Sequence, residues 1–253
     1  MKNDRYRAGL VSISFRQNTP EEILEEVKKS GLSCVEWGSD VHAPCRDLER
    51  LKKIAELQER YGIECSSYGT YFRLGETPLR ELESYITAAK ILGTRVLRLW
   101  CGKKRGADMT DEERNALFEE CRQAAEIAAL SDVMLCMECH MMTFTERAED
   151  ICELMSAVNS PNFRIYWQPF QYLEIEENLK FARSVKHFVE HIHVFNWKQN
   201  ERFPLAEAVD VWRAYLKGFS APRTLLLEFM PDDRIESLSS EASALKQIIG
   251  EIK

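Results

Sequence analysis

The chain has 253 residues, of which 45% are hydrophobic and 30% are charged, which suits a globular protein with a sizeable core and argues against global disorder. Its formal charge of −7 argues against a broad nucleic-acid-binding surface, because such a surface needs a basic field. The five histidines exclude a site built from many imidazoles.

The cysteines and the first residues indicate a reducing compartment. Cys136 and Cys139 come closest to a metal-binding or redox pair among the eight cysteines, but they lie inside an apolar run and enclose Met137 and Glu138. The chain begins MKNDRYR, without an apolar signal segment. Its apolar runs are shorter than the roughly 20 residues of a membrane helix. We therefore expect reduced, mostly buried thiols in a cytoplasmic protein with no membrane partner.

Short apolar runs alternate with longer charged stretches of helical period along the chain. The predicted strands, in chain order, cover residues 8–14, 33–37, 63–68, 95–100, 133–138, 163–167, 189–195 and 224–229. The helices that follow them are predicted over residues 20–30, 47–61, 78–92, 111–130, 145–158, 175–184, 205–216 and 235–252. Thr19-Pro20-Glu21-Glu22 has the order of a capping box, and glycines at positions 31, 62 and 93 end the first three helices.

This alternation predicts a parallel sheet with helical crossovers. Eight units of about 32 residues account for all 253 residues, which predicts a closed α/β barrel, the (β/α)8 or TIM barrel. A doubly wound open sheet is the structural alternative, although it usually has fewer units and no GxGxxG follows the first strand. No linker rich in proline, glycine or serine interrupts the pattern, so we predict a single domain over residues 1–253.

Polar and aromatic side chains lie where the predicted strands end, which is the catalytic end of such a barrel. They are spaced 25 to 38 residues apart, and they are Tyr68, Trp100, Glu138, Gln168, His193 and Glu228. We expect them to converge on one axial pocket. Glu138 and Glu228 follow apolar runs, where an ionised carboxylate is costly unless a cation or hydrogen bonds compensate it. Two carboxylates, an imidazole and an amide oxygen suit a divalent ion.

Each of these residues also has a structural interpretation. Glu138 and Glu228 would then be salt-bridged residues of the barrel mouth, and His193 would be a hydrogen-bonded core histidine. The aromatic residues are either ordinary core residues or walls for a sugar ring.

The segments that carry these residues resemble the sugar phosphate isomerase/epimerase group of xylose isomerase-like TIM barrels. The matching segments are SISFR near 12–16, VEWGSDVHAP at 35–44, SSYGTYFRLG at 66–75, LRLWCG at 97–102, MECH at 137–140, SPNFRIYWQP at 160–169, HIHVFNW at 191–197 and LLLEFMPDD at 225–233. They span nearly the whole chain in the family's order. The resemblance therefore implies a barrel of the xylose isomerase-like type.

The resemblance further implies a divalent metal ion held by Glu138, Gln168, His193 and Glu228. Gln168 departs from the family's pattern, which has Asp there, so the position keeps an oxygen ligand but loses one negative charge. The histidine that typically follows this Asp by three residues is also absent, since Gln171 stands there. We expect Mn²⁺ first, with Mg²⁺, Co²⁺ and Zn²⁺ as alternatives.

Together these inferences predict an enzyme, a metal-dependent isomerase or epimerase of a small sugar or related polyol ketone. It would remove a proton to give a cis-enediolate, with Glu138 and Glu228 as the catalytic pair. The predicted substrate contacts are Glu36, His42, Tyr68, Trp100, His140 and Trp167.

Other functions stay open at this point. A dehydratase or lyase of keto-inositol type needs the same first proton abstraction. A non-catalytic sugar-binding barrel would explain Gln168. Metal-dependent cleavage of DNA is disfavoured by the five histidines and the charge of −7. We expect a sugar or polyol partner, no nucleic acid and no membrane, and we leave a homo-oligomer open.

Overall fold

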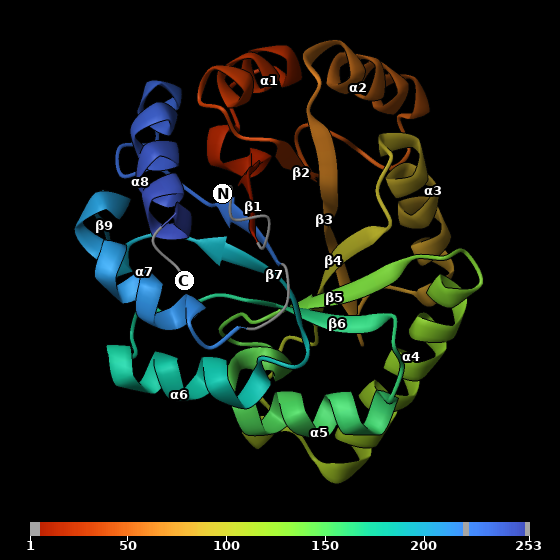
Figure 1. The fold of residues 1–253 in the computed structure, drawn as a ribbon. Coiled ribbons are helices and arrows are strands. Elements are labelled where there is room, and N and C mark those ends of the chain that lie inside the picture. The colour runs from red at the N-terminus through yellow and green to blue at the C-terminus, as the bar shows by residue number, and fades with distance from the viewer. Residues whose placement is uncertain (1–5, 220–222, 251–253) are drawn as a thin grey trace.

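Eight parallel strands form a closed barrel that helices surround (Figure 1). The fold is that of a computed structural model, which describes residues 6–219 and 223–250. The barrel strands are β1 (Tyr6–Val11), β2 (Cys34–Gly38), β3 (Glu64–Leu74), β4 (Val96–Cys101), β5 (Met134–Glu138), β6 (Phe163–Trp167), β7 (Val189–Val194) and β10 (Arg223–Leu227). The helices are α1 (Pro20–Lys29), α2 (Leu48–Tyr61), α3 (Leu82–Leu92), α4 (Asp111–Ala129), α5 (Ala148–Val158), α6 (Ile175–Val185), α7 (Val209–Leu216) and α8 (Leu238–Gly250). β1 closes the barrel by pairing with both β2 and β10, which confirms the predicted TIM barrel.

Helix α1 begins where its capping box predicts. The Thr19 side chain accepts a hydrogen bond from the Glu22 backbone N–H, and the Glu22 carboxylate accepts one from the Thr19 backbone N–H. Gly62 and Gly93 end α2 and α3 with φ angles of 68° and 80°. Glycine adopts this left-handed conformation without strain, so short-range sequence signals place these helix ends.

The first apolar run is not one continuous strand. β1 ends at Val11, and Ser12–Phe15 form a 3₁₀ turn. The hydroxyl groups of Ser12 and Ser14 accept hydrogen bonds from the backbone N–H groups of Gly38, at the end of β2, and Phe229, just beyond β10. These serines therefore tie strand ends together at the barrel mouth instead of extending β1.

Other boundaries also moved from their predicted places. β3 continues to Leu74, six residues beyond its predicted end. A short antiparallel hairpin of β8 (Trp197–Lys198) and β9 (Glu201–Arg202), which the sequence did not predict, follows β7. The final helix begins at Leu238 after a 3₁₀ turn. Residues 251 and 252 of the predicted helix lie outside the described residues.

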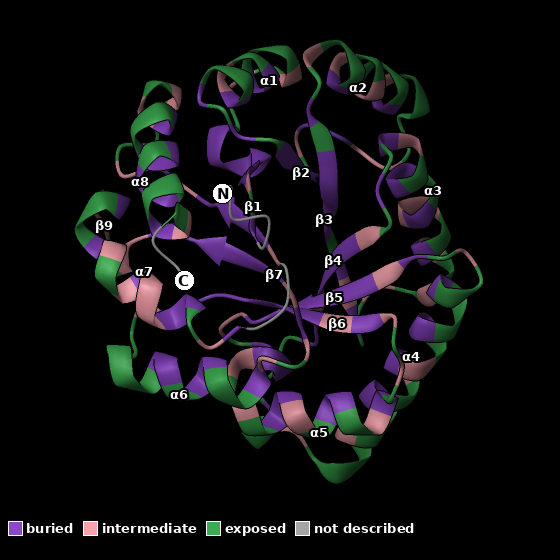
Figure 2. Cartoon of the chain, viewed as in Figure 1, coloured by how far each residue is buried: buried purple, intermediate pink, exposed green. Residues whose placement is uncertain are grey.

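The barrel strands are mostly buried on both faces (Figure 2), which is why they read as apolar runs. Successive residues alternate between the helices and the barrel interior. Trp37 faces outward, because its indole donates a hydrogen bond to Gln58 of α2. Trp167 does so too, packing on Trp212 of α7. Glu36, next to Trp37, therefore faces the interior. No helix in the described ranges is both long and apolar enough to cross a bilayer.

Candidate active site

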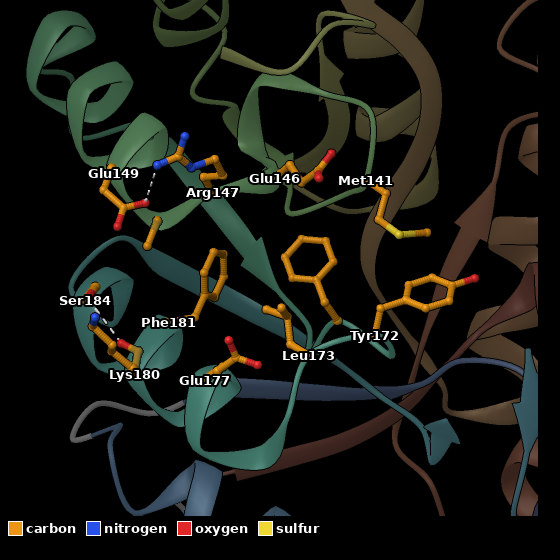
Figure 3. A pocket seen from close by; sticks show the side chains of 12 residues that line it. Met141, Glu146, Arg147, Glu149, Tyr172, Leu173, Glu177, Lys180, Phe181 and Ser184 are labelled. Atoms are coloured by element: carbon orange, nitrogen blue, oxygen red, sulfur yellow. Dashed lines mark hydrogen bonds and ion pairs between the residues drawn. The ribbon is translucent and has the colours of Figure 1, made fainter. Parts of the chain in front are cut away.

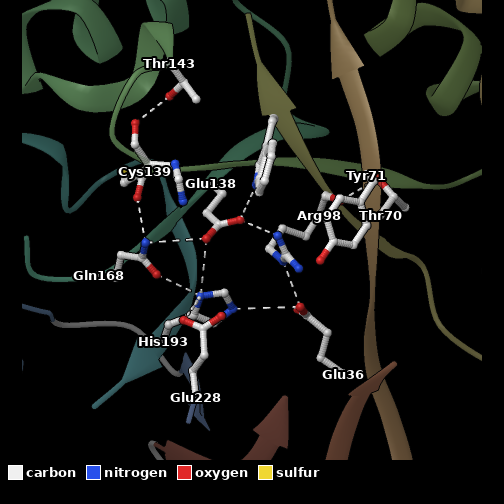
Figure 4. A network of polar contacts seen from close by, with 12 residues as sticks. Glu36, Thr70, Tyr71, Arg98, Glu138, Cys139, Thr143, Gln168, His193 and Glu228 are labelled. Carbon is white, nitrogen blue, oxygen red and sulfur yellow. Dashed lines mark hydrogen bonds and ion pairs between the residues drawn. The ribbon is translucent and has the colours of Figure 1, made fainter. Parts of the chain in front are cut away.

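Four strand ends bring their polar residues together at one end of the barrel (Figure 4). Glu138 is the last residue of β5, and His193 lies near the end of β7. Gln168 and Glu228 directly follow β6 and β10. Ligand atoms of Glu138, His193 and Glu228 lie within 4.8 Å of one another. The expected convergence is therefore present, while the role of each residue stays a prediction.

The oxygens of this cluster surround one nitrogen of His193. Its Nδ1 lies 2.9 Å from Gln168 Oε1, 3.2 Å from Glu228 Oε2 and 3.9 Å from Glu138 Oε1. The Gln168 amide is oriented by its Nε2, which donates a hydrogen bond to the Cys139 carbonyl at 2.9 Å. Its carbonyl oxygen is thereby turned toward His193.

This donor set fits a divalent cation. It offers one nitrogen and three oxygens, two of which belong to carboxylates, and it contains no thiolate. Glu138, Gln168, His193 and Glu228 would hold the ion. All four side chains are buried, so their excess negative charge needs a positive partner.

A proton supplies that charge when no ion is present. Burial by itself would lower the pKa of His193, but the carboxylates of Glu228 and Glu36 outweigh it and raise the pKa to about 10. A proton and a cation therefore compete for the same imidazole.

Arg98 of β4 also belongs to the site, although the sequence analysis did not single it out. Its side chain is buried, with Nε donating to Glu36 Oε1 at 2.8 Å and Nη1 donating to Glu138 Oε2. Trp100 Nε1 donates to the same Glu138 oxygen at 2.5 Å. Burial opposes ionisation of Glu138, but the charges of Arg98 and His193 lower its pKa. The sequence did carry a signal, since Arg98 stands alone between two leucines in an apolar strand.

A cavity of about 100 Å³ lies beside three of the candidate metal ligands, Glu138, Gln168 and Glu228. Its lining includes Glu138, His140, Met141, Gln168, Phe170, Gln171, Phe195, Trp197, Glu228 and Phe229. Aromatic rings from three loops thus form much of its wall.

A larger pocket of about 440 Å³ lies between α5 and α6 (Figure 3). It shares Met141 and Phe170 with the smaller cavity, but its lining contains none of the four candidate ligands. Its ion pair of Arg147 with Glu149 is exposed. Converging buried acid–base groups are found at the smaller cavity, which is therefore the candidate active site.

Of the predicted substrate contacts, His140 lines this cavity and Trp100 packs against His140. Trp100 and His140 stack with ring centroids 4.9 Å apart, and His140 lines the cavity. His140 Nδ1 lies 2.8 Å from the Met141 carbonyl, which leaves Nε2 available. Glu36 lies beneath the site instead, fully buried and bonded to Ser67 and Arg98.

The other three predicted contacts are accounted for by packing elsewhere. Tyr68 is fully buried, and its hydroxyl donates a hydrogen bond to the Ala43 carbonyl. Trp167 packs against α7, as described above. His42 is buried, with its ring nitrogens beside Ser12 Oγ at 3.0 Å and the Asn18 carbonyl at 3.2 Å. Strand register turns Tyr68 and Trp167 toward the helices, so the structure does not bring them to the cavity, and the role of all three residues as substrate contacts stays a prediction.

Comparison with known proteins identifies the family. A family model described as Xylose isomerase-like TIM barrel matches residues 24–248. The chain belongs to this family. The resemblance drawn from the strand-end segments is thereby confirmed.

Individual relatives are distant. The 3-dehydroshikimate dehydratase of Bacillus anthracis is 22% identical over 221 residues, which cover 81% of this chain and 77% of the relative. The solved structure of the probable 3-DHS dehydratase AsbF from Bacillus anthracis, involved in petrobactin synthesis, has a TM-score of 0.79 at 18% identity and covers 94% of this chain and 98% of that chain.

Two further solved structures share the fold. The IOLI protein with a bound zinc atom has a TM-score of 0.77 at 14% identity, covering 98% of this chain and 99% of that one. The D-psicose 3-epimerase of Clostridium cellulolyticum H10, with D-tagatose, has a TM-score of 0.69 at 12% identity, covering 98% of this chain and 99% of that one. Similarity at this level shows the barrel fold.

Proposed function

We propose that this xylose isomerase-like barrel is a metal-assisted dehydratase of a small hydroxylated ketone. It removes a proton from the carbon beside the carbonyl and eliminates a β-hydroxyl as water. This is the dehydratase alternative of the sequence analysis, here with a substrate of the class named for the Bacillus anthracis relative, 3-dehydroshikimate dehydratase. The observation that carries the proposal is that the two glutamates of the site are unequal.

Glu138 is held from both sides. Arg98 and Trp100 donate to its Oε2, and Gln168 Nε2 lies 3.4 Å from its Oε1. The Glu228 side chain, by contrast, has His193 as its one hydrogen-bond or ion-pair partner within the described residues. Glu228 is therefore the carboxylate with the freedom to act as a base in addition to holding the ion, while Glu138 acts as a fixed ligand.

An elimination needs one base and one acid. Glu228 takes the proton, the C–H electron pair moves toward the carbonyl, and the resulting enolate re-forms the ketone as the β-hydroxyl departs. His140, at the cavity wall, supplies the proton with which the hydroxyl leaves as water. A divalent ion, when bound, would polarise the ketone oxygen. The products are an unsaturated ketone and one water; Glu228 then releases its proton to solvent, and His140 takes one up.

Product analysis tests this proposal. Purified protein with Mn²⁺ or Mg²⁺ is incubated with 3-dehydroshikimate, and mass spectrometry is used to look for a product lighter by one water. A matched reaction with Glu228→Gln should lose the product. Full activity in that variant would contradict the assignment of Glu228 as the base.

Epimerisation is the second candidate, favoured by the shared fold with D-psicose 3-epimerase and by the presence of two glutamates at the site. It requires a second group to return a proton to the opposite face. Incubation with D-psicose or D-tagatose separates the two reactions, because an epimer has the same mass as its substrate. Conversion of these sugars without loss of water would favour the epimerase.

A further inference from the structure

Beneath the candidate ligands lies a second layer of buried charge, formed by Glu36 of β2 and Arg98 of β4. Both side chains are almost inaccessible, at 0% and 4% exposed. Charged residues so deep in a barrel are rare unless each has a partner. Figure 4 shows Arg98 between the carboxylates of Glu36 and Glu138. Glu36 also faces His193 there.

Arg98 joins the deep layer to the ligand layer. The guanidinium donates from Nε to Glu36 and from Nη1 to Glu138. It engages one oxygen of Glu138, Oε2, so that Oε1 faces His193 and Gln168. The planar fork of arginine holds both carboxylates at once, and this fixes the rotation of the Glu138 carboxyl group.

Glu36 faces the other nitrogen of His193. Nε2 of His193 is buried and makes no hydrogen bond within the described residues, but it lies 3.8 Å from Glu36 Oε1. The Ser67 hydroxyl donates to the other Glu36 oxygen at 2.9 Å, which holds the carboxyl in place. A carboxylate beside one imidazole nitrogen favours the proton there and leaves the opposite nitrogen free to bind an ion.

The backbone of β3 is shaped around this layer. A Cβ atom at Gly69 would lie 2.5 Å from Glu36 Oε1 and 2.7 Å from Arg98 Nη2. Neither group is at the end of a freely moving side chain, because both are bonded on two sides. Glycine at this position therefore leaves the space that the ion pair occupies.

We propose that Glu36 and Arg98 are positioning residues of the cation site. Arg98 turns one oxygen of Glu138 toward the ion, and Glu36 holds the proton of His193 on Nε2 so that Nδ1 is the coordinating nitrogen. The inference rests on the cation site of the proposed function. It assigns roles to two residues that do not line the cavity.

The test measures zinc binding and the state of His193, so it does not depend on finding a substrate. Zinc affinity of metal-free protein is measured by competition titration for wild type, Glu36→Gln and Arg98→Lys. We expect each variant to bind zinc about 10- to 100-fold more weakly. Lysine should fail to rescue Arg98, because one ammonium group does not reproduce the fork that bridges two carboxylates.

Glu241→Gln is the matched control. Glu241 is also buried but lies in α8, where its carboxylate accepts a hydrogen bond from the Leu205 backbone N–H. This variant should lose stability and keep its zinc affinity. If Arg98→Lys does not fold, Glu36→Gln alone still decides the result.

Nitrogen-15 NMR of the zinc-loaded protein gives a readout that a merely structural role would not move. We expect metal coordination at Nδ1 of His193 and a slowly exchanging proton on Nε2, whose signal moves upfield in Glu36→Gln. Coordination through Nε2, or unchanged zinc affinity in both variants, would overturn the positioning role and leave the proposed function standing. Failure of the wild-type protein to bind zinc would overturn both.

Discussion

The two halves of the barrel bury charge in opposite ways. In the half formed by β2 to β4, Glu36 and Arg98 pair with each other, and Ser67 and Gly69 complete their surroundings. In the half formed by β5, β6, β7 and β10, carboxylate and amide oxygens crowd around one nitrogen of His193.

This contrast distinguishes the half that acts as scaffold from the half that holds the site. A buried ion pair whose opposite charges compensate each other needs no further proton or cation. Buried oxygens in excess of their donors need a proton or a cation. Glu138, Gln168 and Glu228 of the second half also line the cavity, so the proton or cation would be held where a substrate can enter.

The largest expected effect is a difference between variants of Glu138 and variants of Glu228, the two glutamates of the second half. With saturating Mn²⁺, Glu228→Gln should lower kcat by at least about 100-fold, because it removes the base. Glu138→Gln should chiefly weaken Mn²⁺ binding, because its carboxylate is already engaged by Arg98 and Trp100. Steady-state kinetics over a range of Mn²⁺ concentrations distinguish the two. Equal losses of kcat at saturation would show that both glutamates share the chemistry.

Gly69→Ala tests how tightly the scaffold half is packed around Glu36 and Arg98. The added Cβ has no room beside Glu36 and Arg98, so we expect a loss of about 1–3 kcal/mol in the free energy of unfolding. Chemical denaturation of metal-free protein measures it. Gly250→Ala is the control, since a Cβ there meets nothing within 4 Å. A stability loss of the same size in both variants would contradict the tight fit at Gly69.

Gln168→Asp adds a charge to the site half. Since Gln168 Oε1 already faces the cluster, a carboxylate there should raise Mn²⁺ affinity about tenfold, an order-of-magnitude estimate for one added charge near the ion. Isothermal titration of metal-free protein provides the measurement, with Gln168→Asn as the uncharged control. Weaker binding in the aspartate variant would place the ion away from this residue.

A smaller effect concerns pH. The pKa of His193 is raised from 6.5 to about 10 in the folded protein, so its charge stabilises the fold fully below pH 6.5. This contribution is lost as the pH rises toward 10. Metal-free protein should therefore melt at a lower temperature at pH 9.5 than at pH 6, by about 2–4 °C for each kcal/mol lost. In His193→Gln the pH dependence should flatten, and an unchanged slope would assign it to other groups.

Much of this protein follows from its sequence. Short apolar runs that alternate with stretches of 3.6-residue period predict the barrel, because the runs suit strands buried on both faces and the period suits helices packed against them. Thr19 and the glycines at 62 and 93 place helix ends through local backbone chemistry. Glu138 and Glu228 stand out because carboxylates at the ends of apolar strands demand a partner.

Which neighbours of those residues share the site depends on how the strands pair in the closed barrel. Glu36 and Trp37 are adjacent in sequence, yet one faces the barrel interior and the other faces α2. The direction of a side chain depends on strand register, and a shift by one residue reverses it. Arg98 joins Glu36 to Glu138 across 62 and 40 positions of sequence, respectively, so its role exists only once the barrel has closed.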